Sequence, residues 1–301
     1  MKKTPVISWF NNDTVKHLRF PFSFFLLPVF LFALSQAETV NWMKAAVAFA
    51  ILHLLMFPSS NGYNSFQDRD ETSIGGLKNP PKVSENLFYA TLLFDIAAVL
   101  FGLTISVMFS FFVLIFITMS RLYSYRGVRL KKYPVIGFLT VFIFQGAFIF
   151  MMTSAAVSTY SQAVFFTSRN IICMLISSLF IGSMYPLTQI YQHEADKNDG
   201  VTSLSYKLGY RGTFVFSAIL FGSATILLFF HLSEKGHTLA FLLFLLFIMP
   251  VVFHLSKWYN RVKKNIINAD FENTMRTNLL ASVSMNLFFL ILIINNYLML
   301  F

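Results

Sequence analysis

Nine apolar runs, each about as long as a membrane-spanning helix, constrain this sequence more than any other feature. They cover residues 20–36, 42–59, 86–102, 104–120, 134–153, 169–188, 213–231, 238–255 and 279–299. A helix of roughly 17–25 apolar residues crosses a bilayer, so each run is long enough for one span. The chain is 56% hydrophobic and 12% charged, about half the charge of an ordinary soluble domain. We therefore expect an all-α, polytopic membrane protein with nine transmembrane helices.

Basic residues gather in the polar connections on one side of these spans. The segments 1–19, 60–85, 121–133, 189–212 and 256–278 together hold 20 of the 23 Lys and Arg. Cytoplasmic loops carry such an excess, so we expect these segments to face the cytoplasm, as in a bacterial inner membrane. The same rule explains the net charge of +10 without a nucleic-acid partner. The sequence does not identify a protein partner.

Two polar stretches break the apolar pattern on this expected cytoplasmic side. "NSFQDRDET" begins at residue 64 and "QHEADKNDG" at residue 192, 128 positions later. Each contains an amide followed by acids at positions i+4 and i+7, and a basic residue after the first acid. These residues are Asn64, Asp68, Glu71 and Arg69 in the first stretch, and Gln192, Asp196, Asp199 and Lys197 in the second. The repetition indicates a weak internal duplication, near 61–72 and 189–200, within one domain of residues 1–301.

The spacing of these acids predicts a metal site. Residues at i, i+4 and i+7 share one face if the second helix continues through the first stretch. Two facing acidic clusters repel by roughly 2–3 kcal/mol for each carboxylate pair at about 6–8 Å. Mg²⁺ relieves this repulsion, and it binds carboxylates together with substrate phosphates. Alternatively, the two polar stretches are only the solvated ends of helices. The matched pattern of the two stretches favours a site for Mg²⁺ and a diphosphate.

In their order along the chain, these motifs resemble the UbiA superfamily of intramembrane prenyltransferases. The family's first motif, N-x-x-x-D-x-x-x-D, is matched by Asn64 and Asp68, with Thr72 in place of the last Asp. Its second, D-x-x-x-D, is matched by Gln192 and Asp196, and "GVTSLSYKLG" follows. The segment "YSYRGVRLKKYPVIG" also resembles the loop after the family's fourth helix, and "LRFPFS" its N-terminal segment. The resemblance covers nearly the whole chain.

The resemblance implies an enzyme that transfers a prenyl group from a polyprenyl diphosphate to a hydrophobic acceptor. Its nine helices would surround a central, lipid-accessible cavity, with the active site facing the cytoplasm. Asn64, Asp68 and Asp196 are the expected catalytic residues. The expected Mg²⁺ ligands are Asn64, Asp68, Glu71, Gln192, Asp196 and Asp199. Basic side chains suit the diphosphate, and the candidates are Arg69, Arg129, Lys131 and Lys197.

Other functions remain open from the sequence. A non-catalytic lipid-binding or transport protein could keep this scaffold, and a terpene cyclase of the UbiA type would ionise the same diphosphate without a separate acceptor. Only Asp95 is a clear charge inside a span; it either orients an acceptor or bonds to another helix. The identity of the acceptor and the prenyl chain length cannot be read from the residues.

Overall fold

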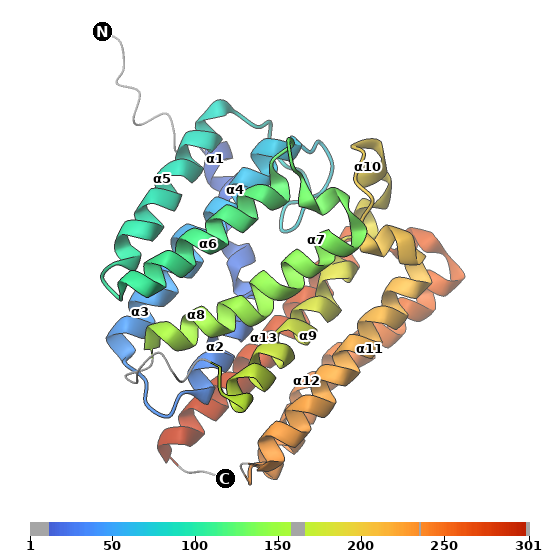
Figure 1. The fold of residues 1–301 in the computed structure, drawn as a ribbon. Helices are drawn as coiled ribbons and strands as arrows, with labels where there is room; N and C mark the ends of the chain where they lie inside the picture. Colours follow the sequence, from blue (N-terminus) through green and yellow to red (C-terminus); the bar gives the residue numbers. More distant parts are fainter. Residues whose placement is uncertain (1–11, 158–165, 235, 299–301) are drawn as a thin grey trace. The chain divides into compact units, whose positions relative to one another are not determined.

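The computed structural model describes residues 12–157, 166–234 and 236–298, and within them the secondary structure is almost entirely helical (Figure 1). The chain divides into two compact units. Unit 1 contains Met1–Phe24 and Trp42–Lys131, and unit 2 contains Phe25–Asn41 and Lys132–Phe301. Neither unit is continuous in sequence, because the segment 25–41 belongs to the later half of the chain. The prediction of one domain over residues 1–301 stays a prediction.

Unit 1 is built around three long membrane helices. A π-helical turn, Ile51–Met56, joins α3 to α4, so that Trp42–Asp68 forms one helix. The helices of this unit are α1 (Asn12–Leu18), α3 (Trp42–Ala50), α4 (Phe57–Asp68), α5 (Glu85–Gly102) and α6 (Val107–Ser124). Helices α5 and α6 lie side by side and both pack against α4 (Figure 1).

Unit 2 contains the remaining spans. A second π-helical turn, Phe142–Phe148, joins α7 to α8. The helices are α2 (Leu27–Gln36), α7 (Pro134–Val141), α8 (Ile149–Val157), α9 (Ser168–Thr188), α10 (His193–Asn198), α11 (Leu204–Glu234), α12 (Thr238–Lys264) and α13 (Phe271–Leu298). Gly209 interrupts α11 with a φ of 68°, a left-handed conformation that glycine adopts without a steric penalty.

The predicted fold class is confirmed. In the described part of the chain, eight helices are long and apolar enough to cross a membrane, and a ninth if the bent pair Asn12–Phe25 and Leu27–Gln36 counts as one span. This pair is bent by 41°, so the first predicted run, residues 20–36, is not a straight helix. Pro28 lies at the start of α2, where proline is tolerated because it has no N–H to leave unpaired.

A tight hairpin joins α5 to α6, the helices of the third and fourth predicted runs. Helix α5 ends at Gly102 and α6 begins at Val107. Ser106 caps α6, because its Oγ accepts a hydrogen bond from the backbone N–H of Phe109 at 3.0 Å. A Cβ on Gly102 would lie 3.0 Å from the Cα of Ser110. The hairpin is therefore closed by an N-cap and by a glycine at the contact between the helices.

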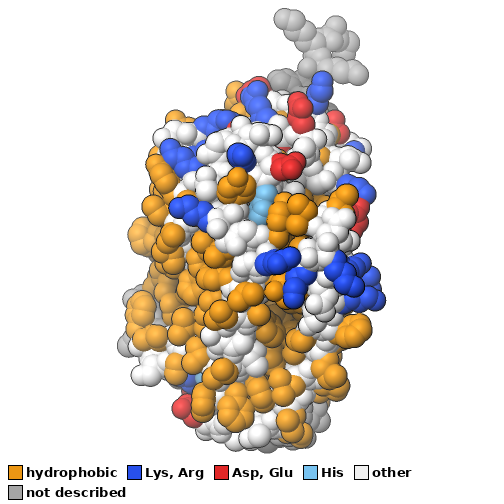
Figure 2. All heavy atoms as spheres, turned by 90° about the vertical axis from the view of Figure 1, so that its right-hand side faces the viewer, with side chains coloured by type: hydrophobic (Ala, Val, Ile, Leu, Met, Phe, Trp, Pro, Cys, Tyr) orange, Lys and Arg blue, Asp and Glu red, His pale blue; other side chains and the backbone are white. Residues whose placement is uncertain are grey.

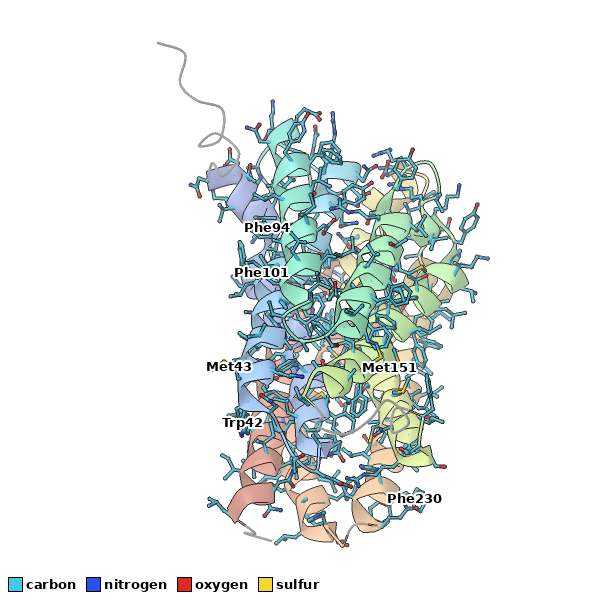
Figure 3. The ribbon with its side chains drawn as sticks, turned by 60° about the vertical axis from the view of Figure 1, so that its left-hand side comes forward. Trp42, Met43, Phe94, Phe101, Met151 and Phe230 are labelled. Carbon is cyan, nitrogen blue, oxygen red and sulfur yellow. The ribbon has the colours of Figure 1, made fainter. Side chains whose placement is uncertain are left out.

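Apolar side chains cover much of the surface. Trp42, Met43 and Phe101 are 50%, 75% and 56% exposed, and Figure 3 shows them on α3 and α5. On the face drawn in Figure 2, hydrophobic side chains cover a broad area, and Lys and Arg gather toward one end. Large exposed apolar areas are typical of lipid contact, as expected for a multi-pass membrane protein.

Candidate functional site

Asp68 lies at the C-terminal end of α4, one turn after Asn64. The Asn64 amide donates hydrogen bonds to Asp68 Oδ2 at 2.9 Å and to Ser124 Oγ at 3.2 Å. Residues four apart on an α-helix share a face, so the first part of the predicted arrangement is present. The Asp68 side chain is only 4% exposed. A carboxylate this buried requires donors or positive charge around it.

Two cations from the segment after α6 supply that charge. Arg129 Nη2 donates to Asp68 Oδ1 at 3.2 Å, and the Lys131 ammonium forms an ion pair with Asp68 Oδ2. The side chains of Arg129 and Lys131 are 8% and 13% exposed. The structure therefore brings together four predicted site residues, Asn64, Asp68, Arg129 and Lys131, which we call the Asp68 cluster.

Arg126 holds this segment against the end of α4, and the sequence reasoning gave it no role. Its Nε donates to the carbonyl oxygen of Gln67 at 2.6 Å, and its Nη2 to that of Asp68 at 3.2 Å. The last carbonyls of a helix lack partners within the helix and carry partial negative charge. One sequence feature could have indicated this role: arginines are frequent in the segment after α6, and the last carbonyls of any helix need hydrogen-bond donors.

The backbone at Arg129 is in an unusual conformation. Its φ is 50°, in the left-handed region that residues other than glycine rarely adopt. The carbonyl of Tyr125 accepts hydrogen bonds from the N–H groups of Val128 and Arg129 at 3.0 and 2.7 Å. Such strain persists only where the surroundings enforce it, and it clusters at functional sites. Here it coincides with the ion pair to Asp68.

The expectation that the helix continues through Glu71 is wrong. Helix α4 ends at Asp68 because Arg69 adopts a left-handed conformation, with φ 54°. Glu71 lies exposed in the following loop, off the face of Asn64 and Asp68. Arg69 pairs with Glu85 at 3.0 Å, and both side chains are more than half exposed. The roles of Glu71 as a metal ligand and of Arg69 in diphosphate binding stay predictions.

Arg19 anchors the loop between α4 and α5. Its guanidinium donates to the carbonyl oxygens of Asn61 at 2.9 Å and Gly75 at 3.1 Å. Ile74 and Leu77 bond to each other through their backbones, both at 2.9 Å. The loop is therefore tied to the N-terminal segment of unit 1 at a defined place.

The second acidic motif belongs to unit 2 and has a different local structure. Gln192 ends the 3₁₀ turn Ile190–Gln192, Asp196 and Lys197 lie on α10, and Asp199 follows that helix. Lys197 is exposed, whereas the two acids and Gln192 are half-buried. The change from a 3₁₀ turn to an α-helix disturbs the regular i, i+4 and i+7 spacing that the sequence suggested.

His193 has a structural environment inside unit 2. The side chain is buried, and its Nε2 lies 2.8 Å from Ser205 Oγ, which in turn lies 3.0 Å from Thr213 Oγ1. Thr213 Oγ1 also donates to the carbonyl of Gly209 at 2.8 Å. The network therefore links α10 to both sides of the break in α11. His193 therefore has a hydrogen-bonding partner within unit 2.

Asp95 forms an ion pair inside unit 1. Arg121, in the last turn of α6, donates from Nε to Asp95 Oδ2 at 2.9 Å, and its Nη2 pairs with the same oxygen. Ser59 on α4 donates to Asp95 Oδ1 at 2.6 Å. Arg121 also lies over the Tyr63 ring, 3.8 Å from its centre. The sequence left two roles open for Asp95, and the structure shows the bond to another helix. This network connects α4, α5 and α6.

The donor atoms of the Asp68 cluster fit one kind of Mg²⁺ site. Within residues 12–157, 166–234 and 236–298, no three His, Cys, Asp or Glu side chains group closely enough to hold a metal ion. Asp68 does offer carboxylate oxygens, and Asn64 an amide oxygen, on one helix face. Mg²⁺ commonly takes one or two carboxylates plus waters and substrate phosphates. These residues therefore fit an ion that binds together with a phosphorylated substrate.

The sequence matches a family profile described as the UbiA prenyltransferase family over residues 24–280. No curated protein sequence matches the chain. The matched range includes the Asp68 cluster and the second acidic motif.

The fold is similar to that of several solved structures. An apo UbiA homologue from Aeropyrum pernix K1 has a TM-score of 0.65 at 16% identity, over 92% of this chain and 98% of that chain. A UbiA homologue from Archaeoglobus fulgidus bound to GPP and Mg²⁺ has a TM-score of 0.64 at 15% identity, over 94% and 99%. A structure described for digeranylgeranylglyceryl phosphate synthase has a TM-score of 0.58 at 18% identity, over 94% and 97%. At sequence identities this low, the similarity to these structures shows a shared fold.

Proposed function

The chain belongs to the UbiA prenyltransferase family, and from this premise we propose that it transfers a prenyl group from a prenyl diphosphate to a hydrophobic acceptor in the membrane. As a member of that family it is an enzyme and a multi-pass integral membrane protein. The Asp68 cluster carries the proposal for the donor site. It combines a buried carboxylate, a carboxamide and two cations, which are the groups that a metal–diphosphate complex requires.

The donor class is supported by relatives. The homologue from Archaeoglobus fulgidus was solved with GPP and Mg²⁺ and also with DMAPP and Mg²⁺. Both ligands are prenyl diphosphates, so the same class of donor is proposed for this chain.

The residues of the cluster have distinct roles. Arg129 binds phosphate oxygens through its planar guanidinium, and Lys131 acts as a point charge beside them. When the bond between the allylic carbon and the diphosphate oxygen breaks, the electron pair goes to the diphosphate, and these cations stabilise it. When bound, Mg²⁺ supplies further charge neutralisation. Asn64 and Asp68 would hold it, and Asp196 is proposed as a further catalytic ligand.

The ion pairs of Asp68 suggest how the site changes on binding. Without a diphosphate, Arg129 and Lys131 neutralise the buried carboxylate. A phosphate group competes for the same cations, because it is an equally good acceptor for them. If both cations moved to the donor phosphate, the oxygens of Asp68 would be available to hold Mg²⁺. The cluster therefore avoids an unpaired buried charge in either state.

The remaining predicted residues complete the proposal. Glu71, Gln192 and Asp199 are proposed as further metal ligands, and Arg69 and Lys197 as additional contacts for the diphosphate. Thr72 and Gln192 replace family aspartates, so this metal site has fewer charges than the family pattern. The asymmetry of Lys and Arg favours a cytoplasmic location for the site, and a bacterial inner membrane is proposed.

Ligand-induced thermal stabilisation tests the proposal. Purified protein is heated with geranyl or geranylgeranyl thiodiphosphate, with and without Mg²⁺. Stabilisation that requires both the diphosphate and the metal supports the donor site, while none with either chain length contradicts it. Product analysis with added acceptors then distinguishes transfer from cyclisation of the donor alone.

A further inference from the structure

The ends of α12 and α13 that are joined by the segment 265–270 carry an excess of positive charge. From His254 to Arg276 the sequence contains five Lys and Arg and two acids. Three of these cations interact electrostatically with His254 and therefore gather around one place: Lys257, Arg261 and Arg276. In the described part of the chain, none of the three forms an ion pair with a carboxylate. Like charges that gather without a counter-charge repel, so this place favours an anion.

His254 is a buried imidazole among these cations. The residue is 7% exposed, whereas Lys257, Arg261 and Arg276 are exposed. Its ring donates a hydrogen bond to the backbone of Asn273, but its Nε2 has no partner among the described residues. In the neutral ring this nitrogen is an acceptor, and leaving such a buried atom unpaired is costly. The place therefore lacks a hydrogen-bond donor as well as a counter-charge.

The connection between the two helices holds their cationic ends together. Trp258 Nε1 donates to the carbonyl oxygen of Asn268 at 2.6 Å, and Asn268 Nδ2 donates to that of Arg261 at 3.3 Å. The Arg261 guanidinium donates to Asn273 Oδ1 at 2.7 Å, and Asn273 Nδ2 donates to Asp270 Oδ2 at 2.7 Å. The guanidinium of Arg261 is therefore fixed between α12 and α13, and Asp270 acts on it only through an amide.

The position of the cations along the two spans matches the depth of lipid headgroups. The apolar runs of α12 and α13 cover residues 238–255 and 279–299. Lys257 follows the first run by two residues, and Arg276 precedes the second by three. Long basic side chains at the ends of spans place their charged groups at the membrane surface. The phosphate groups of a bilayer lie at this same level.

Exposed apolar side chains continue from these cations along both helices. On α12, Met249, Phe253 and Lys257 are four residues apart and share one face. On α13, Leu279 lies three residues after Arg276, so these two are neighbours on the helix surface. Met249, Phe253 and Leu279 are 62%, 73% and 51% exposed. A free phosphate ion has no use for this apolar surface, whereas the chains of a phospholipid cover it.

We propose that the cationic ends of α12 and α13 bind the headgroup of an anionic phospholipid. The lipid phosphate contacts Lys257, Arg261 and Arg276, and the acyl chains lie against the exposed apolar side chains of the two helices. A headgroup with a hydroxyl group, such as that of phosphatidylglycerol, also supplies the donor that His254 lacks. All of these residues belong to unit 2, and binding of the lipid does not depend on the Asp68 cluster.

Two lipids that differ only in the headgroup test the proposal. The full-length protein in a neutral detergent is titrated with dioleoyl phosphatidylglycerol or dioleoyl phosphatidylcholine, and the apparent Kd is taken from the thermal shift. We expect phosphatidylglycerol to bind at least tenfold more tightly, because only its headgroup carries a net negative charge. Equal affinity for the two lipids would overturn the proposal.

A double variant locates the site. Lys257→Gln combined with Arg276→Gln should weaken phosphatidylglycerol binding at least tenfold, since each cation near an anionic lipid contributes about fivefold. The matched control, Lys207→Gln combined with Lys263→Gln, also removes two exposed charges from unit 2. Neither of these lysines is among the cations around His254, so the affinity should change less than threefold. Equal losses in the two double variants would show that net charge alone determines binding, and would refute the site.

Two further measurements keep the test decisive. The apparent Tm without added lipid reports folding, and we expect no change, because both substituted side chains are exposed. If the double variant does not fold, Arg276→Gln alone should weaken binding about fivefold, and an unchanged affinity would refute the site. Inorganic phosphate distinguishes a lipid from a free anion. Stabilisation by phosphate that equals the effect of phosphatidylglycerol, and that the double variant abolishes, would contradict the lipid as the ligand.

Discussion

Lys131 and Asp68, which are 63 positions apart in the sequence, form an ion pair whose side chains are 13% and 4% exposed. Removing one member of such a buried pair is costly, because it leaves the other charge uncompensated. The pair also joins the two segments that supply the proposed donor site, the end of α4 and the segment after α6. The contact between these two segments therefore depends on the charges of Lys131 and Asp68.

Replacing Lys131 with Met should weaken binding of geranyl thiodiphosphate in the presence of Mg²⁺ about 10- to 100-fold. A hydrogen bond to a charged group contributes roughly 1.5–3 kcal/mol, which corresponds to that range. The Met side chain keeps most of the aliphatic length, so the change removes mainly the charge. A thermal-shift titration of wild type and variant gives the ratio of the two apparent Kd values.

Lys132→Met is the matched control for this prediction. The Lys132 ammonium lies 4.9 Å from the centre of the Tyr133 ring, and no role in diphosphate binding is proposed for it. We expect the affinity to change less than threefold. Equal losses in Lys131→Met and Lys132→Met would show that the general positive charge of the segment, rather than the contact with Asp68, determines binding.

The ion pair of Asp95 and Arg121 should be structural. Asp95→Leu leaves Arg121 uncompensated, and its side chain is only 21% exposed, so we expect a loss of about 3–5 kcal/mol in the free energy of unfolding. The double variant Asp95→Leu with Arg121→Met should recover much of that loss, because neither charge remains. The apparent Tm of both single variants and the double variant completes the cycle.

A simple additive result would contradict this account. If the double variant loses as much as the sum of the single variants, the pair does not stabilise the contact of α5 with α6, and the function of Asp95 has to be sought elsewhere.

Gly146 allows α9 to approach the π-helical turn between α7 and α8. A Cβ at this position would lie 2.4 Å from the Cα of Ser178, and the Ser178 Oγ accepts a hydrogen bond from the N–H of Ala147 at 2.9 Å. We expect Gly146→Ala to destabilise the protein by about 1–3 kcal/mol through overpacking. Its apparent Tm should fall clearly below that of the wild type.

Gly222→Ala provides the comparison. Gly222 lies in α11, and a Cβ there meets no atom within 4 Å. Alanine has the higher helix propensity, by up to about 1 kcal/mol, so the apparent Tm should be unchanged or slightly raised. A similar fall in Tm for both variants would mean that glycine is needed for backbone flexibility rather than for the contact with Ser178.

The membrane spans were predictable because a long apolar run has few alternatives to a helix. The end of α4 was not, since nothing in "QDRDET" shows that Arg69 would adopt a left-handed conformation. The sequence pattern therefore extended the helix to Glu71. Local backbone geometry at a helix end depends on contacts such as those of Arg126 with the last carbonyls.

The partner of Asp95 was missed for a related reason. Arg121 was assigned to a cytoplasmic loop because it follows an apolar run that appeared to end at residue 120. In the structure α6 continues to Ser124, and the guanidinium points back to Asp95 and Tyr63. Long basic side chains near span ends can reach either water or the protein interior, and only the register of neighbouring helices decides between them.

The most direct test of the central claim uses Asp68→Asn. Binding of geranyl thiodiphosphate is measured for wild type and variant, each with Mg²⁺ and with EDTA. If Asp68 is a Mg²⁺ ligand that otherwise pairs with Arg129 and Lys131, Mg²⁺ should strengthen binding by the wild type at least tenfold. The variant should bind independently of Mg²⁺ and, with its two cations free for phosphate, at least as tightly as the wild type in EDTA. Full retention of the Mg²⁺ effect in Asp68→Asn would contradict the account.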